Sequence, residues 1–319
     1  MNPRDVRWPD FILIGAQKSG TSSLHYILAQ HPRVFMPDGE VFFFDVDDRE
    51  QHPDFFPARL GVEHDLDRDF ARYAAWYDAM LRPAGDRLAG EDSTTYLASK
   101  RAPERVERWA PEARLIAMLR DPVQRAWSHY WHLVRSGRAT LPFERLVEER
   151  PGNLLRRGFY REQLERWRPA LDAGRLRVFL FEDFVRDPQR VVDAACAHIG
   201  LADTVDVSTV ETHRNKATPP ISLPLRLALN RIRAPFEPYR YNRRVPGMPG
   251  YRPGRGRPDA SHPVTRAWEW LQEATSPKRY PPMTLDARAR LETLYRREND
   301  GLDALLGVDL AAVWPWWPS

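Results

Sequence analysis

The sequence predicts an α/β fold, in which a central parallel sheet is flanked by helices on both faces. Short apolar runs of strand length alternate along the chain with longer segments of helical pattern, and this alternation is typical of a parallel sheet covered on both sides. The runs are almost continuously hydrophobic, as expected for strands buried on two faces. A chain of 319 residues can bury a substantial core, and we expect residues 1–319 to form a single domain.

The predicted elements follow this alternation in order. Strands are predicted at 10–14, 87–91, 114–119 and 176–181. Helices are predicted at 21–30, 69–81, 102–109, 122–136, 160–172, 188–199 and 284–306.

A glycine-bounded turn follows the first strand. The apolar run Phe11–Ile14 leads into Gly15–Ser23, and a helical pattern of Leu24, Ile27 and Leu28 begins directly afterwards. Backbone N–H groups point outward at such a turn, and the positive end of the helix dipole favours an anion. The segment is therefore predicted to cradle a phosphate, and the alternative is a tight strand–helix turn with an exposed lysine.

The turn departs from the Walker A pattern, G-x-x-x-x-G-K-[ST], that binds nucleoside triphosphates. Gly20 is followed by Thr21, and the lysine, Lys18, lies two residues before Gly20. A nucleotide kinase needs its lysine after that glycine, on the β- and γ-phosphates, and a hydroxyl group on Mg²⁺. The loop therefore suits a nucleotide without a triphosphate.

A second phosphate-binding pattern begins where the strand Leu115–Leu119 ends. Arg120 follows that strand, and Asp121 and Pro122 suit the N-cap and first residue of a helix. Ligands bind at the carboxyl ends of strands in open α/β sheets, so Arg120 and Ser128 of that helix could share one phosphate. The alternative is an arginine that caps a strand and a serine that faces solvent.

Together the two patterns resemble those of sulfotransferases that use 3′-phosphoadenosine-5′-phosphosulfate (PAPS). They are most similar to the Golgi-type glycosaminoglycan (heparan sulfate) sulfotransferases and their bacterial relatives. In that family the loop matching Gly15–Ser23 binds the 5′-phosphosulfate, and an R-x-P-x-x-R-x-x-S-x-Y element, here Arg120–Tyr130, binds the 3′-phosphate. The resemblance covers most of residues 9–215 and the C-terminal part. Further matching segments are Glu40–Asp45, Trp76–Tyr77, Gly90–Tyr96, Gly158–Tyr160, Phe181–Phe184 and Leu305–Trp314.

The resemblance implies a three-layer, P-loop-like fold, PAPS as the cosubstrate and no metal ion. The residues that it assigns to the nucleotide are Gly15, Lys18, Ser19, Gly20, Thr21, Ser22, Ser23, Arg120, Ser128, Tyr160, Lys278 and Arg279. Two assignments have alternatives. Tyr160 could instead pack in the core, and Arg214–Lys216 competes with Lys278 and Arg279 for the place over the 3′-phosphate.

Two residues are candidates for catalysis. Sulfuryl transfer moves an SO₃ group in line between two oxygens, and by analogy with phosphoryl transfer we expect a loose transition state. Lys18 is suited to neutralise the charge that builds on the leaving phosphate. Glu40 precedes an aromatic triplet that would partly bury it and raise its pKa, which suits a general base. In the glycosaminoglycan branch, the Glu before such a triplet is the base.

Two positions depart from the family pattern near this candidate base. The residue before it is often Lys in the bacterial relatives and is Gly39 here, and the residue after Glu91 is often Lys in the glycosaminoglycan branch and is Asp92 here. Relative to the family pattern, the lysine is missing at Gly39, and an acid replaces the lysine at Asp92. An acid at Asp92 would disfavour a sulfated polysaccharide, so the identity of the acceptor stays open.

Composition sets limits on partners and location. The net charge of +4, from 48 basic and 44 acidic residues, suits an anionic cosubstrate without requiring nucleic acid. The single cysteine, Cys196, excludes an internal disulfide framework and a multi-cysteine zinc site, and we expect a buried thiol. No window approaches the apolar length of a membrane span, and residues 1–9 lack an apolar signal region. We therefore expect a cytoplasmic bacterial enzyme without a transmembrane segment.

The segment 216–283 is dense in proline and arginine. Within Arg240–Arg257 there are six arginines and no acid. The pattern predicts an irregular basic loop between short helices near 224–232 and 263–274. A long loop of this kind is expected to form a lid over the acceptor or over the 3′-phosphate, and the alternative is a solvated insertion.

Three hypotheses for function follow. The first is PAPS-dependent sulfation of a hydroxyl group on a carbohydrate or glycoconjugate. The second keeps this chemistry but changes the acceptor to a phenol, a tyrosine or a secondary metabolite. The third is a nucleotide-binding protein that has lost turnover, and the joint presence of Lys18, Glu40, Arg120 and Ser128 argues against it. The sequence specifies neither the acceptor, the position sulfated nor the oligomeric state.

Overall fold

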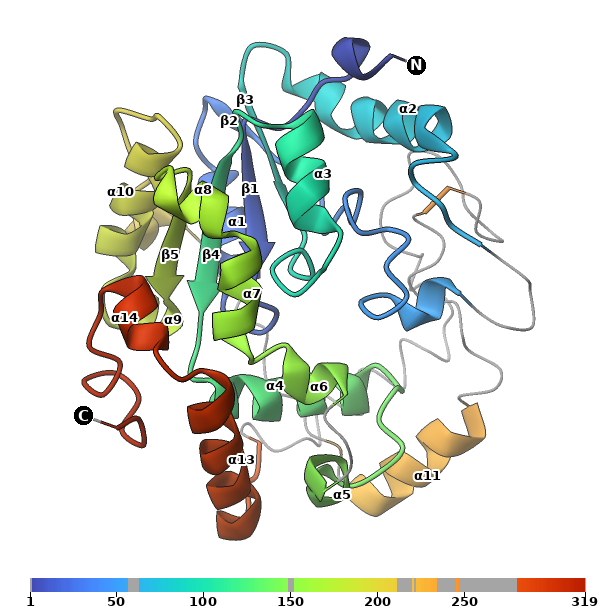
Figure 1. Cartoon of the computed structure of the whole chain (residues 1–319), viewed down its shortest axis with the longest axis vertical. Helices are drawn as coiled ribbons and strands as arrows, with labels where there is room; N and C mark the ends of the chain where they lie inside the picture. The colour runs from blue at the N-terminus through green and yellow to red at the C-terminus, as the bar shows by residue number, and fades with distance from the viewer. Residues whose placement is uncertain are drawn as a thin grey trace.

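The computed structural model describes residues 2–56, 63–148, 152–210, 220, 222–233, 245–246 and 280–318. Within these residues, a five-stranded sheet has the order β2-β3-β1-β4-β5, and every pair of neighbouring strands is parallel (Figure 1). The strands are β1 (Phe11–Gly15), β2 (Val34–Phe35), β3 (Leu88–Asp92), β4 (Arg114–Leu119) and β5 (Leu176–Leu180). The predicted α/β class with a parallel sheet is confirmed.

Helices connect the strands and cover the sheet. Those in the first part of the chain are α1 (Thr21–Leu28), α2 (Phe70–Leu81), α3 (Ala102–Trp109), α4 (Pro122–Arg135) and α5 (Phe143–Glu148). Those in the second part are α6 (Asn153–Arg156), α7 (Tyr160–Arg166), α8 (Arg168–Asp172), α9 (Phe181–Arg186), α10 (Pro188–His198), α11 (Leu223–Arg233), α13 (Leu285–Glu298) and α14 (Leu302–Leu306). Short 3₁₀ helices lie at Pro3–Asp5, Pro53–Phe55, Arg82–Ala84 and Val207–Thr209.

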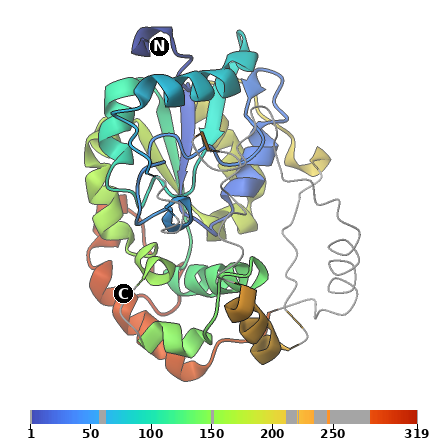
Figure 2. The same ribbon diagram turned by 90° about the vertical axis from the view of Figure 1, so that its right-hand side faces the viewer.

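Side chains of the central strand β1 alternate between two hydrophobic clusters, one on each face of the sheet. Phe11 and Leu13 pack in the cluster that includes α1, α9 and α10, whereas Ile12 and Ile14 pack in the cluster that includes α2, α3, α4, α7 and α13. The two views agree with this division, because α3, α7 and α8 lie over one face and α1 and α10 over the other (Figures 1 and 2). Burial on both faces explains why the strand is continuously apolar.

The carboxyl ends of the strands share one edge of the sheet. Leu13 of β1 is in register with Asp92 of β3 on one side and with Ile116 of β4 on the other. The loops that follow β1, β3 and β4 therefore start side by side, and α4 runs across below them (Figure 1). This edge is where open α/β sheets bind ligands.

Two predicted helices are each divided in two. The predicted helix 160–172 consists of α7 and α8, which meet at Trp167, because Pro169 in the first turn of α8 has no N–H group to continue the helical ladder. The predicted helix 284–306 consists of α13 and α14. Gly301, with a φ of 71°, starts α14, and a left-handed residue cannot lie inside an α-helix.

Other predictions differ in smaller ways. The sequence missed β2, which has two residues and pairs with β3 through Val34 and Leu88, as well as the short helices α5, α6 and α9. The helix near 224–232 is confirmed as α11, whereas 263–274 and all of 240–257 except residues 245–246 lie outside the described residues. Cys196 is buried and free, as predicted. Among the described helices, none has the length and apolar character needed to cross a bilayer.

Candidate active site

The loop between β1 and α1 has a shape that only glycine permits at Gly20. This residue has a φ of 87° and precedes the first turn of α1. A Cβ atom there would lie 2.7 Å from the ring of Phe181, the first residue of α9. The Phe181 ring thus packs directly against the loop, and any side chain at Gly20 would clash with it.

Several polar groups of this loop have no hydrogen-bond partner among the described residues. Among the described residues, no protein acceptor pairs with the backbone N–H groups of Gly20, Thr21 and Ser22. The Ser19 hydroxyl is also buried without a hydrogen-bond partner in the described part of the chain. Buried polar groups are normally satisfied, and outward N–H groups at a helix N-terminus suit an anion. The loop therefore has the features of a phosphate site.

Lys18 and Arg120 place two cations at this loop. The Arg120 guanidinium donates a hydrogen bond of 3.3 Å to the carbonyl oxygen of Lys18 and lies 4.8 Å above the centre of the Phe181 ring. Burial, together with the charges of Arg135 and Arg120, lowers the pKa of Lys18 to about 8. Burial also lowers the pKa of Arg120. Concentrated positive charge of this kind favours a multiply charged anion.

Two contacts hold the backbone at Arg120. The Tyr160 hydroxyl donates a hydrogen bond of 2.8 Å to the Arg120 carbonyl oxygen, and the tyrosine ring is fully buried. Asp121 caps α4 by accepting hydrogen bonds from the backbone N–H groups of Val123 and Gln124. Tyr160 therefore supports Arg120 from the core side, and its predicted contact with the nucleotide stays a prediction.

Helix α4 carries two histidines that lie near the cations of the site. Ser128 is half-buried on this helix, and His132, one turn further on, has its pKa lowered to about 3 by burial and by the charges of Lys18 and Arg135. Burial and the charge of Arg125 likewise hold the pKa of His129 well below its usual range. Both histidines are therefore neutral at physiological pH.

Glu40 is bound by the loop that follows β3. The backbone N–H of Thr94, just after β3, donates a hydrogen bond of 3.0 Å to Glu40 Oε1, and the Thr94 hydroxyl donates to the same oxygen. Burial and the negative charge of Asp92 raise the pKa of Glu40, against the effect of these hydrogen bonds and of Arg157. A half-buried carboxylate that is fixed in orientation and has a raised pKa suits a general base.

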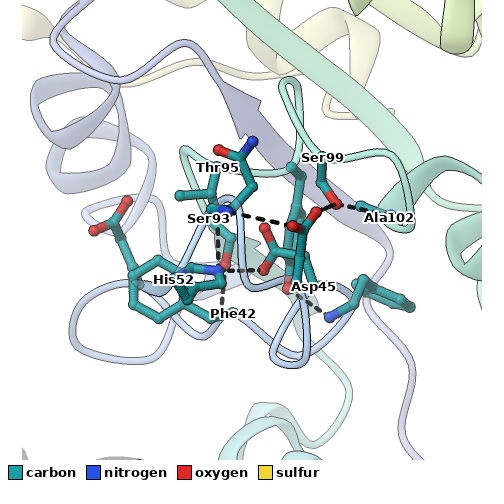
Figure 3. Close-up of polar contacts among 12 residues, drawn as sticks. Phe42, Asp45, His52, Ser93, Thr95, Ser99 and Ala102 are labelled. Carbon is teal, nitrogen blue, oxygen red and sulfur yellow. Dashed lines mark hydrogen bonds and ion pairs between the residues drawn. The ribbon is translucent and has the colours of Figure 1, made fainter. Parts of the chain in front are cut away.

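The segment that carries Glu40 is held against the loop after β3, as Figure 3 shows. The Ser93 hydroxyl oxygen accepts a hydrogen bond of 2.8 Å from the backbone N–H of Phe42, which has a φ of 62°. The buried carboxylate of Asp45 pairs with His52 at 2.8 Å, and His52 also lies 3.4 Å from the Thr95 hydroxyl. These contacts fix the backbone on which Glu40 is presented.

Arg157, just after α6, joins the phosphate loop to the segment that follows Glu40. Its guanidinium donates to the side-chain oxygen of Gln17, to the Gln51 side chain at 3.2 Å and to the Gln51 carbonyl at 3.0 Å. Burial lowers the pKa of Arg157 to about 10, so it stays charged. Arg157 and Gln51 also line a polar cavity of about 420 Å³.

Three aspartates form a cluster with the spacing of metal ligands. Asp47, Asp65 and Asp67 bring three carboxylate oxygens within 4.8 Å of one another. However, the buried Asp47 already forms ion pairs with Arg105 at 2.6 Å and Arg101 at 3.0 Å, and Arg105 also binds Asp67 at 2.8 Å. The arginines supply the positive charge that these acids need, so we assign no metal here.

The structure brings the predicted loop residues, Arg120 and Glu40 to one edge of the sheet, and Ser128 lies on α4, which runs across below that edge (Figure 1). The predicted Lys278 and Arg279, and the competing Arg214–Lys216, lie outside the described residues. Sequence reasoning missed Arg157, His25 and Arg135. Spacing along α4 could have indicated Arg135, since it lies seven residues after Ser128 and thus on the same face.

Comparison with known proteins gives consistent results. A profile of the Sulfotransferase family matches residues 9–205, which is more than half of the chain. Human heparan sulfate glucosamine 3-O-sulfotransferase 6 is 29% identical over 215 residues, which cover 64% of this chain and 55% of the human protein. Mouse bifunctional heparan sulfate N-deacetylase/N-sulfotransferase 4 is 25% identical over 230 residues, which cover 64% of this chain and 24% of that protein. The chain thus spans about half or less of these relatives.

A solved structure resembles the chain over most of its length. The sulfotransferase from Alicyclobacillus acidocaldarius has a TM-score of 0.57 and 26% sequence identity, and the match covers 97% of this chain and 100% of that one. The fold, the phosphate loop and the family profile agree, and the chain belongs to the sulfotransferase family.

Proposed function

We propose that this protein transfers a sulfuryl group from PAPS to a hydroxyl group on a carbohydrate or glycoconjugate acceptor. One relationship carries the proposal. Lys18 and Glu40 lie close enough that the Glu40 carboxylate raises the pKa of Lys18, partly offsetting the effect of burial. This interaction supports the pairing of a cation for the leaving group with a carboxylate for the acceptor proton.

The residues present fit a nucleotide with two separate phosphate groups. The unpaired N–H groups and the Ser19 hydroxyl would hold the 5′-phosphosulfate, and Arg120 with Ser128 would hold the 3′-phosphate. The hydrogen bond from Arg120 to the Lys18 carbonyl supports this arrangement, because it would hold the two sites at a set spacing. Tyr160 supports Arg120 through its hydrogen bond, and its own contact with the nucleotide stays a prediction.

In the proposed reaction, Glu40 accepts the proton of the acceptor hydroxyl as that oxygen forms its bond to sulfur. The bond from sulfur to the bridging phosphate oxygen breaks, and its electron pair stays on the phosphate. Lys18 and the N–H groups of the loop stabilise the negative charge that develops there. The raised pKa of Glu40 increases its strength as a base near neutral pH.

The acceptor class is supported by the curated relatives, whose names specify heparan sulfate. A direct test is to incubate the purified protein with PAPS and pooled sugar, lipid or phenol acceptors and to search for SO₃ addition by mass spectrometry. Products that carry the added group on a sugar support the proposal, and Lys18→Ala should abolish them. Products confined to the phenol pool would contradict the acceptor class, and nucleotide binding without any product would contradict turnover.

A further inference from the structure

A buried ion pair lies beside Glu40 and takes no part in the steps above. His25 is on α1, and Asp92 is the last residue of β3. The His25 Nδ1 atom lies 3.4 Å from Asp92 Oδ2, and the two residues are 5% and 3% exposed. The second carboxylate oxygen, Asp92 Oδ1, is buried and has no hydrogen-bond partner among the described residues.

The pair is attached to the backbone that presents Glu40. The backbone N–H of Val41 donates a hydrogen bond of 3.2 Å to the Asp92 carbonyl oxygen. Thr94, two residues after Asp92, binds the Glu40 carboxylate. The carboxylates of Asp92 and Glu40 are therefore held on two adjoining segments, and neither can move away from the other without breaking these contacts.

Charged groups from several described segments act on Glu40. Asp92 from β3 is the largest charge that raises its pKa, and Arg157 lowers it. Lys18 on the phosphate loop also interacts with Glu40. Asp92 raises the pKa of His25 despite burial, with smaller contributions from Asp38 and Glu40. The charge of Asp92 therefore acts on both Glu40 and His25 and links the protonation of these two groups.

We propose that Asp92 and His25 form a positioning pair that controls whether Glu40 holds a proton. The negative charge of Asp92 disfavours the ionised form of Glu40, and protonated His25 weakens that effect by neutralising Asp92. The inference rests on the role of Glu40 as the base in the proposed function. It predicts that removing the charge of Asp92 lowers the pKa of Glu40, whereas removing His25 raises it.

The first test is the pH dependence of kcat/KM for sulfuryl transfer, which reports the pKa values of the free enzyme. Asp92→Asn removes the negative charge with little change of shape, and the acid limb should move to lower pH by about half a unit or more. His25→Gln leaves Asp92 without its cation, and the limb should move to higher pH. A merely structural pair would lower activity at all pH values in both variants.

A second His–Asp pair, whose aspartate is 61% exposed and also pairs with Arg33, provides a control. His31 Nε2 lies 3.4 Å from Asp203 Oδ2, the same separation as in the His25–Asp92 pair. Asp203→Asn should leave the acid limb where it is. If Asp92→Asn and Asp203→Asn give the same profile, or if Asp92→Asn and His25→Gln move the limb in the same direction, the proposal is wrong.

A measurement that does not depend on turnover separates this proposal from the proposed function. NMR titration of the His25 imidazole in the ligand-free protein should show a raised pKa that falls in Asp92→Asn. The ¹³C signal of the Glu40 carboxylate should titrate at lower pH in the same variant and at higher pH in His25→Gln. Unchanged titrations would overturn the pair even if transfer is observed. Normal turnover in Glu40→Gln would overturn the base while these titrations still test the pair.

Discussion

The Arg120 guanidinium donates a hydrogen bond of 3.3 Å to the carbonyl oxygen of Lys18, across a separation of 102 residues in sequence. Lys18 belongs to the loop after β1, and Arg120 to the end of β4. The contact therefore joins the two phosphate-binding patterns of the sequence into one site. It also explains why the two patterns would act on a single nucleotide.

This joint site predicts a preference among nucleotides. Adenosine 3′,5′-bisphosphate carries both phosphates that the site would hold, so it should stabilise the protein by about 2.7 kcal/mol at a hundredfold excess over Kd. Thermal unfolding should show a clear rise in Tm with the bisphosphate and a much smaller rise with ATP and Mg²⁺. A larger shift with ATP and Mg²⁺ would contradict the assignment.

Gly20→Ala should damage the phosphate loop. The new Cβ would lie 2.7 Å from the Phe181 ring at a residue whose φ is 87°. Gly174→Ala is the control, because Gly174 also has a positive φ, of 66°, but no atom lies within 4 Å of its Cβ position. In both variants the left-handed conformation lowers the free energy of unfolding by about 1–2 kcal/mol. Overpacking lowers it by about 1–3 kcal/mol more, and only in Gly20→Ala. Chemical unfolding and bisphosphate titration measure the difference, and equal losses would show that the contact with Phe181 is unimportant.

Glu40→Gln should lower kcat by about 10²–10⁴-fold, because the amide keeps the shape but cannot accept the acceptor proton. Affinity for adenosine 3′,5′-bisphosphate should change little. Glu104→Gln, on the exposed face of α3, makes the same chemical change away from the site and should have normal turnover. Steady-state kinetics and calorimetric binding test both expectations, and near-normal turnover in Glu40→Gln would exclude it as the base.

Arg157→Gln should destabilise the protein and weaken nucleotide binding together. The substitution removes hydrogen bonds from a buried guanidinium to Gln17 and Gln51, and bonds to charged groups contribute about 1.5–3 kcal/mol. Arg156→Gln is the control, because that side chain is 55% exposed and forms a surface ion pair with Glu50, which is worth less than about 1 kcal/mol. Urea unfolding and bisphosphate affinity report the two effects, and equal behaviour of the variants would remove Arg157 from the site.

Affinity for the bisphosphate should fall as the pH rises through about 8. The pKa of Lys18 in the free protein is lowered to about 8, so its ammonium is charged below that pH and increasingly neutral above it. An anionic ligand favours the charged form, and binding is therefore strongest on the acid side of this value. Lys18→Arg should flatten the dependence, since guanidinium stays charged throughout. A wild-type affinity that does not change between pH 7 and 9.5 would show that Lys18 does not contact the ligand.

Features whose pattern lies in adjacent residues could be predicted from the sequence, whereas features that depend on contacts between distant residues could not. The strands β1 and β4 are continuous apolar runs with a clear turn or cap directly after them, so local pattern was sufficient. The edge strand β2 has only Val34 and Phe35, which is too short to show any periodicity. Pro169 could have indicated the break between α7 and α8, but the strong helical pattern on both sides hid it.

The same reasoning applies to the site. The phosphate loop and Arg120 carry their information in adjacent residues. Arg157 and His25 do not, because each acquires its role only through partners that the fold brings near. His25 on α1 contacts Asp92 at the end of β3. Nothing in the local sequence of α1 distinguishes this residue from a helical histidine that packs in the core.

The side chain of Asp121 has a consequence for the order of folding. One of its oxygens caps α4 beside Arg120, and the other accepts a hydrogen bond of 3.1 Å from the Trp316 indole, 195 residues later in the chain. On the ribosome, the turn that carries Arg120 therefore emerges long before the residue that completes its hydrogen bonding. We expect the nascent chain to acquire its full nucleotide affinity only after Trp316 has been synthesised, well after the residues of the sheet.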